Sequence, residues 1–187
     1  TVFNTPGTYP VKLVACNSFG CDSITKLINV ITPVTMCTDD SSNNAIGVFY
    51  DSGGPSGNYQ NYENCSFLIS PGNCTDSIKI HFNAFQLESC CDYFRVYNGP
   101  TTTSPLLFSG NGTTIPPDIT GTANKMLITF SSDGSVVYAG WDVNWTSFQQ
   151  TATAPIANFT FTPTTPAVLD TVFFTDASVA FDCTCAD

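Results

Sequence analysis

The sequence predicts an all-β protein built from antiparallel β-sandwiches, and three observations carry this prediction. Short segments such as residues 78–82 and 126–130 alternate apolar and polar side chains at the period of a β-strand. Turn-forming residues separate these segments, with Asn98-Gly99 as the strongest hairpin signal. No segment keeps a helical period over three turns. We therefore predict one central sandwich flanked by two incomplete sandwich halves.

The N-terminal half is expected over residues 1–31. Residues 9–15 alternate, which places Val11 and Leu13 on one face of a strand. A four-residue hairpin loop at residues 17–20 then returns the chain into a second strand.

The central module is expected over residues 37–148, and the C-terminal half over residues 155–187. The last strand of the central module carries three apolar residues at a spacing of two, which are best explained as core: Trp141, Val143 and Trp145. Five tyrosines are expected to leave a partly exposed aromatic surface for sugars or a partner: Tyr50, Tyr59, Tyr62, Tyr93 and Tyr97.

Composition narrows the classes of function. Only 11% of the residues are charged, and 5 basic against 15 acidic residues give a formal net charge of −10. The basic residues are scattered singly, which argues against nucleic-acid binding. No apolar run is long enough for a transmembrane helix. Nine cysteines favour an oxidising compartment, so we expect a secreted, extracellular or cell-surface protein. The absence of a signal peptide and of an initiating Met leads us to expect a processed or excised piece.

The two ends resemble parts of one domain family. Residues 5–13 and the turn at 17–20 resemble the C-terminal half of a PKD domain, which is Ig-like. Residues 157–163 and 172–178 resemble the N-terminal half of the same family. The strand and turn that join these halves in the family are absent here. The resemblance implies two incomplete β-sandwiches whose open edges need partners.

The central module resembles a CUB domain of the kind found in bacterial surface proteins. The resemblance lies in six motifs: residues 49–54, 64–69, 82–88, 92–99, 130–133 and 140–141. It implies an antiparallel β-sandwich that has no catalytic activity of its own, and in many members of the family a Ca²⁺ ion and protein partners.

The CUB resemblance also implies the metal ligands. The acidic residues that hold Ca²⁺ in the family correspond to Glu88, Asp92 and Asp133. Carboxylates are the oxygen ligands that Ca²⁺ prefers, and three of them converging without a cation would repel one another. The alternative is that these are three exposed loop acids in an acidic protein, with no metal.

The nine cysteines are an odd number, so at least one is free or bonded to another chain. Cys16 and Cys21 flank the first hairpin loop, and directly opposed strand positions are close enough for a disulfide. Cys183 and Cys185 are candidates for bonds between units. A zinc site there is disfavoured because the only histidine, His81, is distant in the sequence.

The usual CUB pattern implies two further disulfides. It pairs Cys37 with Cys65. Because the family's later cysteine is replaced by Ser109, it leaves Cys74 to pair with Cys90 or Cys91.

Catalysis is not expected. A Ser–His–Asp or Cys–His site would have to use His81, which points outward in an alternating strand. Three Asp-Ser/Thr-aliphatic triplets, at Ser23, Ser77 and Thr171, resemble O-glycosylation sites of secreted bacterial proteins.

The leading functional hypothesis is a structural and adhesive repeat unit of an extracellular bacterial filament or long adhesin. Neighbouring copies would complete the half domains, within one chain or between chains. Two alternatives remain open. One is a non-catalytic binding or spacer module of a larger secreted enzyme. The other is a surface domain that uses Ca²⁺ to bind a protein or glycan.

Overall fold

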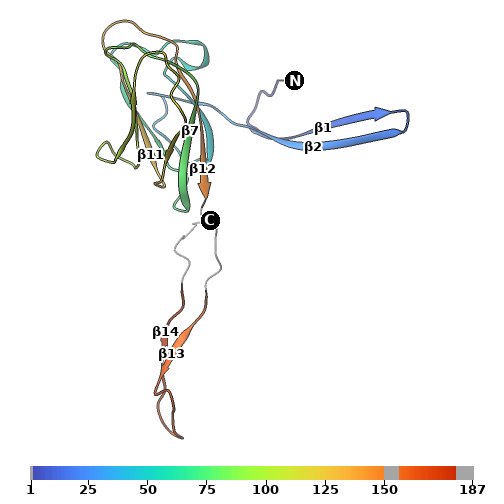
Figure 1. Cartoon of the computed structure of the whole chain (residues 1–187), viewed down its shortest axis with the longest axis vertical. Helices are drawn as coiled ribbons and strands as arrows, with labels where there is room; N and C mark the ends of the chain where they lie inside the picture. Colours follow the sequence, from blue (N-terminus) through green and yellow to red (C-terminus); the bar gives the residue numbers. More distant parts are fainter. Residues whose placement is uncertain (1, 150–155, 180–187) are drawn as a thin grey trace.

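The computed structural model describes residues 2–149 and 156–179, and these form β-strands joined by loops and one short 3-10 helix (Figure 1). No helix of this described part is long and apolar enough to cross a membrane. The elements are β1 (Gly7–Asn17), β2 (Gly20–Val30), β3 (Val34–Thr35), β4 (Ser41–Ser42), β5 (Ile46–Tyr50), η1 (Gly54–Ser56), β6 (Asn64–Ile69), β7 (Thr75–Gln86), β8 (Tyr93–Tyr97), β9 (Leu106–Gly110), β10 (Ile119–Gly121), β11 (Met126–Ser131), β12 (Gly140–Gln149), β13 (Phe159–Thr162) and β14 (Phe173–Asp176).

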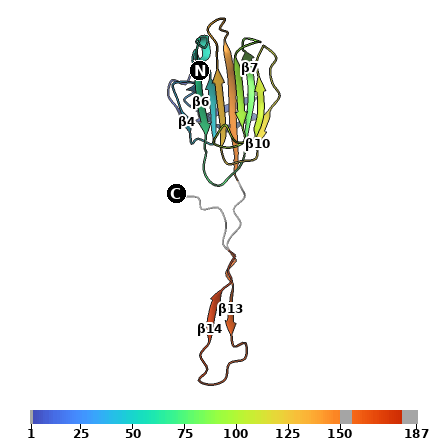
Figure 2. The same ribbon diagram turned by 90° about the vertical axis from the view of Figure 1, so that its left-hand side faces the viewer.

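Two five-stranded sheets form the central sandwich (Figure 2). One sheet has the order β10-β7-β12-β5-β3 and the other the order β4-β6-β11-β8-β9. All pairs are antiparallel except β3 with β5 and β4 with β6, where short edge strands run parallel to their neighbours. The prediction of an all-β sandwich is confirmed.

Aromatic side chains from both sheets fill the space between them. Trp141 lies at the centre, with ring centroids 4.9 Å from both Phe94 and Phe130. Phe49 stacks on Phe67 at 4.5 Å, which joins β5 of one sheet to β6 of the other. Large rings bury much apolar area and their edge-to-face contacts fix their orientation. The alternation in the sequence thus produces one continuous core.

A bulge in β7 changes which side chains of that strand face inward. Asp142 of β12 pairs with Ala84 and Val143 with Phe82, so Asn83 has no opposite residue. Phe82 and Phe85 are therefore both buried, although they are three positions apart. Past the bulge, β7 leads into the loop that carries Glu88.

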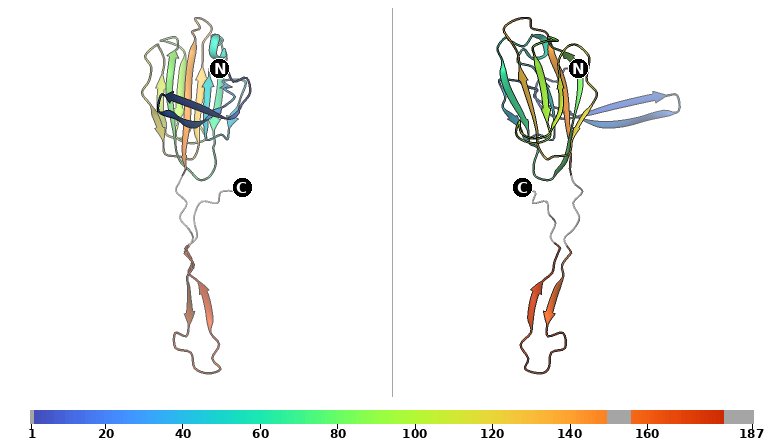
Figure 3. Two further views of the ribbon diagram at one scale, coloured as in Figure 1. Left: turned by 90° about the vertical axis from the view of Figure 1, so that its right-hand side faces the viewer. Right: turned by 60° about the vertical axis from the view of Figure 1, so that its left-hand side comes forward.

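Two hairpins, β1–β2 and β13–β14, form separate two-stranded sheets (Figures 1 and 3). Their strands pair with each other and with no strand of the sandwich. Cys16 lies opposite Cys21, and Asn17 opposite Gly20. The loop between β1 and β2 is therefore two residues long, shorter than the expected four, because Asn17 and Gly20 form the last strand pair.

Asn98-Gly99 does not make a tight hairpin turn, contrary to the prediction. It begins the longer connection from β8 to β9. The Asn98 side chain accepts a hydrogen bond from the Ala123 backbone N–H at 2.9 Å and donates one to Thr122 Oγ1 at 3.1 Å. Its amide therefore serves as a bridge to the loop after β10.

Candidate metal centre

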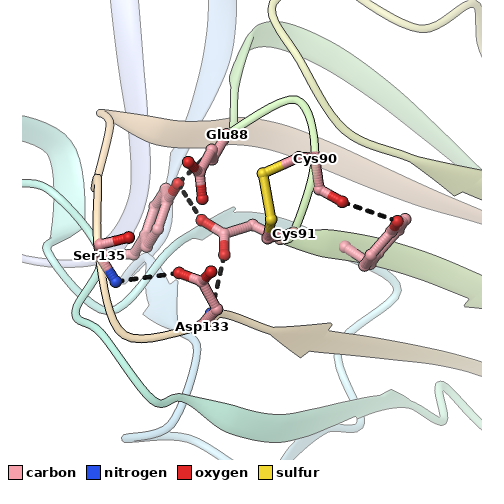
Figure 4. The surroundings of a disulfide bond; sticks show 8 residues. Glu88, Cys90, Cys91, Asp133 and Ser135 are labelled. Atoms are coloured by element: carbon pink, nitrogen blue, oxygen red, sulfur yellow. Dashed lines mark hydrogen bonds between the residues drawn. A yellow bond between two sulfur atoms is a disulfide. The ribbon is translucent and has the colours of Figure 1, made fainter.

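Three acidic side chains converge at one end of the sandwich (Figure 4). Glu88 follows β7, Asp92 directly precedes β8, and Asp133 follows β11. One carboxylate oxygen from each lies within 4.8 Å of the others. The structure thus brings together the three residues that the sequence proposes as Ca²⁺ ligands.

Asp92 is the fixed point of this cluster. Its side chain is fully buried. The Tyr59 hydroxyl donates a hydrogen bond to Oδ2 at 2.5 Å, and the Asp133 backbone N–H donates one to Oδ1 at 2.9 Å. Burial and the neighbouring Asp92 carboxylate raise the pKa of Tyr59, so the phenol keeps its proton. Both oxygens of Asp92 are therefore held in place.

Glu88 is the least satisfied member. Its backbone N–H donates to the Tyr59 hydroxyl at 3.1 Å, which ties the loop to the same phenol. Its Oε2 atom is enclosed and has no hydrogen-bond partner. Burial first, and then the charges of Asp133 and Asp92, raise the pKa of the Glu88 carboxyl. These are the properties of a carboxylate that lacks a positive partner.

Asp133 is oriented by its own loop. Its Oδ1 accepts a hydrogen bond from the Ser135 backbone N–H at 2.9 Å. Among the described residues, the ion pairs found are those of Asp118 with Lys79 and His81, so no basic side chain neutralises the cluster. An oxygen-only set of carboxylates with an enclosed, unpaired oxygen fits a hard divalent cation such as Ca²⁺.

A disulfide between adjacent residues, Cys90 and Cys91, lies in the short loop that joins Glu88 to Asp92 (Figure 4). This corrects the expectation that one of them pairs with Cys74, which is itself disulfide-bonded. The two sulfur atoms also lie close to the Glu88 carboxylate. As long as the two sulfur atoms are bonded to each other they are not thiolates, so Glu88, Cys90 and Cys91 cannot bind a metal that needs thiolate ligands.

The remaining cysteines of the described part are paired as well. Cys16 bonds Cys21 across the first hairpin, and Cys37 bonds Cys65 across 28 positions of the sequence. Cys183 and Cys185 lie outside the described residues.

Two buried polar residues were not predicted from the sequence, and one of them, Tyr59, contacts the acidic cluster. Tyr59 was expected on an exposed aromatic surface, but it is fully buried, and its ring packs edge-on to Phe130 at 5.0 Å. Asp51 is also fully buried; it accepts hydrogen bonds from the backbone N–H groups of Gly53 at 2.8 Å and Trp141 at 3.3 Å. Tyr59 bonds Asp92 and Asp51 bonds Trp141, and both partners lie far away in the sequence, so no local pattern reveals these contacts.

The other residues singled out by sequence lie apart from this cluster. His81 is exposed and hydrogen-bonds Asp118 at 2.6 Å. Ser23 and Thr171 are exposed, whereas Ser77 is half-buried within β7. Their glycosylation stays a prediction.

Comparison with known proteins identifies the central module. The family model for the CUB domain matches residues 37–145. Similar proteins include a bone morphogenetic protein 1 homolog of Strongylocentrotus purpuratus, 39% identical over 46% of this chain and 14% of its own. An astacin-like metalloendopeptidase of Gallus gallus is 36% identical over 48% of this chain and 23% of its own. Cubilin of Canis lupus familiaris is 32% identical over 56% of this chain and 3% of its own. The match thus spans under a quarter of each relative.

Solved structures share the fold. The CUB1-EGF-CUB2 domain of human MASP-1/3 superposes with a TM-score of 0.51 at 23% identity, over 59% of this chain and 42% of that one. The full extracellular region of zebrafish Gpr126/Adgrg6 superposes with a TM-score of 0.53 at 21% identity, over 64% of this chain and 16% of that one. CUB domains are non-catalytic binding or spacer modules of extracellular proteins. Through residues 37–145, this chain belongs to the CUB domain family.

Proposed function

We propose that this chain is a structural and adhesive repeat unit of an extracellular bacterial filament or long surface adhesin. Its CUB domain would serve as the body of the unit, and the hairpins β1–β2 and β13–β14 as the joints to neighbouring copies. One observation carries the proposal: large apolar side chains on both hairpins, such as Leu13 and Phe174, are 67% and 68% exposed. Exposed apolar faces of this kind mark interaction sites.

The hairpins need such joints for physical reasons. An isolated two-stranded hairpin is marginally stable in water, and its outer edges leave backbone hydrogen-bond groups unpaired. Each hairpin resembles half of an Ig-like PKD domain, so a neighbouring copy that supplies the other half would bury the apolar face. A contact between unlike ends does not close on itself, so repeated contacts would build a fibre.

The joints could form within one long chain or between separate chains. Reducing, denaturing mass analysis of the natural material tests this directly. A species near 20 kDa recovered from an assembled fibre is the result expected for separate subunits. A much larger chain with several copies of this sequence would mean a tandem array. A large chain with a single copy would overturn the repeat-unit proposal.

The acidic cluster supports a second function, Ca²⁺-dependent binding of a surface protein or glycan. Glu88, Asp92 and Asp133 would hold the cation, which would offset the repulsion between the three carboxylates and order the loops that capture a Lys or Arg of the partner. The enclosed, unpaired Oε2 of Glu88 favours this function. If partner binding depends on the cation, Asp133→Ala should abolish it, whereas under the repeat-unit proposal assembly should persist.

A spacer or docking role in a larger secreted enzyme is the third candidate. It is favoured by the similarity to an astacin-like metalloendopeptidase, of which this chain covers 23%. A catalytic domain in the same natural polypeptide would support this role, and its absence would argue against it.

A further inference from the structure

One face of the hairpin β1–β2 is more apolar than the other. Residues directly opposite each other in an antiparallel pair share a face. The register therefore groups Leu13 with Ile24 and Tyr9 with Ile28, and Val11 with Lys26, on one side. The other side is mixed: it carries the polar pairs Thr8 with Asn29 and Lys12 with Thr25, and also the exposed Leu27 and Val14. Phe3 packs on Tyr9 at one end of this more apolar face, with ring centroids 4.6 Å apart. Leu13 and Ile24 are 67% and 55% exposed, so no other described residue covers their part of the face.

The hairpin β13–β14 has the same two-faced character. Phe161 lies opposite Phe174, and Phe159 opposite Asp176. The three phenylalanine rings touch one another, with centroids 5.5 Å apart for Phe159 and Phe174 and 6.3 Å for Phe161 and Phe174. The opposite side carries Thr160 with Thr175 and Thr162 with Phe173, so it has one aromatic ring where the first side has three. A compact aromatic patch is thus exposed to solvent.

The two hairpins carry charges of opposite sign. The whole chain has a net charge of −10. Residues 7–30 contain Lys12 and Lys26 against Asp22, so they carry 2 − 1 = +1. Residues 156–179 contain Asp170 and Asp176 and no basic residue, so they carry −2. The apolar face of β1–β2 includes Lys26 beside Leu13 and Ile24, and Asp22 opposite Ala15. The apolar face of β13–β14 includes Asp176 beside Phe159.

We propose that the apolar face of β1–β2 is the docking surface for the apolar face of β13–β14 of a second copy, with Lys26 facing Asp176. This rests on the proposed function as a repeat unit and names its joint. The phenylalanine trio would cover Val11, Leu13 and Ile24 in a face-to-face sandwich. Pairing of two β13–β14 hairpins is disfavoured because it would bring two aspartates together on desolvated faces, and pairing of two β1–β2 hairpins would join two units of net charge +1. The assembly is therefore head-to-tail.

Adjacent residues on opposite faces offer matched variants for the test. Leu13→Asp places a charge on the proposed docking face of β1, while Val14→Asp places it on the reverse face of the same strand. Phe174→Asp and Phe173→Asp form the equivalent pair on β14. All four side chains are at least 52% exposed, so these substitutions leave the CUB core intact. The intact chain is studied by sedimentation velocity over a concentration series, with circular dichroism as a check of folding.

Head-to-tail docking predicts a distinctive pattern. The unmodified chain, Val14→Asp and Phe173→Asp should form growing oligomers. Leu13→Asp alone and Phe174→Asp alone should stay monomeric, because burying a leucine or phenylalanine accounts for at least about a tenfold change in dissociation constant. An equimolar mixture of these two variants should form dimers and nothing larger, since one intact face remains on each partner.

Other patterns identify which proposal fails. If each single variant forms dimers by itself, like hairpins pair with each other and the head-to-tail joint is wrong. If the unmodified chain oligomerises and Leu13→Asp and Phe174→Asp do so equally, the copies meet elsewhere, and only this inference fails. An unmodified chain that stays monomeric throughout the series would contradict assembly itself.

The charge pair gives an independent test of register. Lys26→Glu should weaken the association, and Asp176→Lys in the partner should restore it. Lys12→Glu, on the reverse face of the same hairpin, is the control and should gain nothing from Asp176→Lys. Equal behaviour of Lys26→Glu and Lys12→Glu would overturn the proposed facing of Lys26 and Asp176.

Discussion

The Tyr59 hydroxyl lies 2.5 Å from Oδ2 of Asp92, in the interior of the protein. The Tyr59 hydroxyl oxygen also accepts a hydrogen bond from the Glu88 backbone N–H at 3.1 Å. One phenol therefore links two of the three acidic residues and orients them without adding charge. Partners of this kind, which touch the ligands and not the metal, strongly influence metal affinity.

Tyr59→Phe should weaken Ca²⁺ binding while leaving the carboxylates in place. Loss of an orienting partner typically costs about 10- to 100-fold in metal affinity. The variant should also lose about 1–3 kcal/mol of stability, because the buried Asp92 keeps one fewer hydrogen bond. Calorimetric Ca²⁺ titration and chemical denaturation measure both effects. Tyr62→Phe, at an 81% exposed tyrosine, is the control and should change neither.

Asp133→Asn should separate electrostatic repulsion from metal binding. The asparagine Oδ1 can still accept the Ser135 N–H bond, so the loop geometry is retained. Without Ca²⁺ the variant should be as stable as the parent or more stable, because Glu88 loses one like-charged neighbour. With Ca²⁺ its affinity should fall by at least about tenfold.

Thermal unfolding with a chelator measures the stability without Ca²⁺, and unfolding at increasing Ca²⁺ concentration measures how strongly the ion stabilises each variant. Asp76→Asn, at an exposed acid of β7 outside the cluster, is the matched control. If Ca²⁺ stabilises Asp133→Asn as much as the parent, the three carboxylates are not the binding site.

Asp51 should titrate far above an ordinary aspartate. Burial raises its pKa from 3.8 to about 6, the Glu63 charge adds to the rise, and the N–H groups of Gly53 and Trp141 oppose it. A raised folded-state pKa means that the charged form disfavours folding. The penalty is complete above pH 6, shrinks as the pH falls, and is gone below the unfolded value of 3.8.

Carboxyl-resonance NMR should therefore show a midpoint near pH 6 for Asp51. Between pH 7 and pH 4, this group should add stability on acidification, at most about 3 kcal/mol for a shift of about two pH units. Asp51→Asn should remove this contribution to the pH dependence of stability, and Asp76→Asn should keep it. An NMR midpoint near 4 would contradict the argument.

The sandwich was predictable because its signal is local. Alternation in β7 and β11 places Ile80 and Ile128 in the core within a few residues of sequence. The bulge at Asn83 was not, because alternation alone cannot show where one strand gains a residue relative to its neighbour. Family resemblance supplied the three acids, which no periodicity would reveal.

The polar contacts of the buried Tyr59 and Asp51 were not predictable from the sequence. Tyr59 and Asp92 are 33 positions apart, and Asp51 and Trp141 are 90 apart. The local sequence around Tyr59 and Asp51 does not mark either residue as buried. The Cys90–Cys91 bond was missed for a different reason: the partner is the next residue in the sequence, whereas the CUB resemblance directed attention to Cys74.

Gly47 should tolerate no side chain. It lies opposite Trp145 on β12, and a Cβ atom at Gly47 would lie 1.8 Å from the indole ring. The ring cannot simply move away, because Trp145 is buried and its Nε1 donates to the Asn44 carbonyl at 3.1 Å. Gly47→Ala should therefore cost about 3 kcal/mol or more of stability.

Chemical denaturation of Gly47→Ala, Trp145→Leu, the combination of these two changes and the control Thr146→Ala checks this argument. Thr146 is exposed on the adjacent strand, so Thr146→Ala should stay within about 0.5 kcal/mol of the parent. Combining Gly47→Ala with Trp145→Leu should cost less than the sum of the two single changes, because the smaller side chain leaves room for the new methyl group. Additive costs would mean that the indole does not cover Gly47.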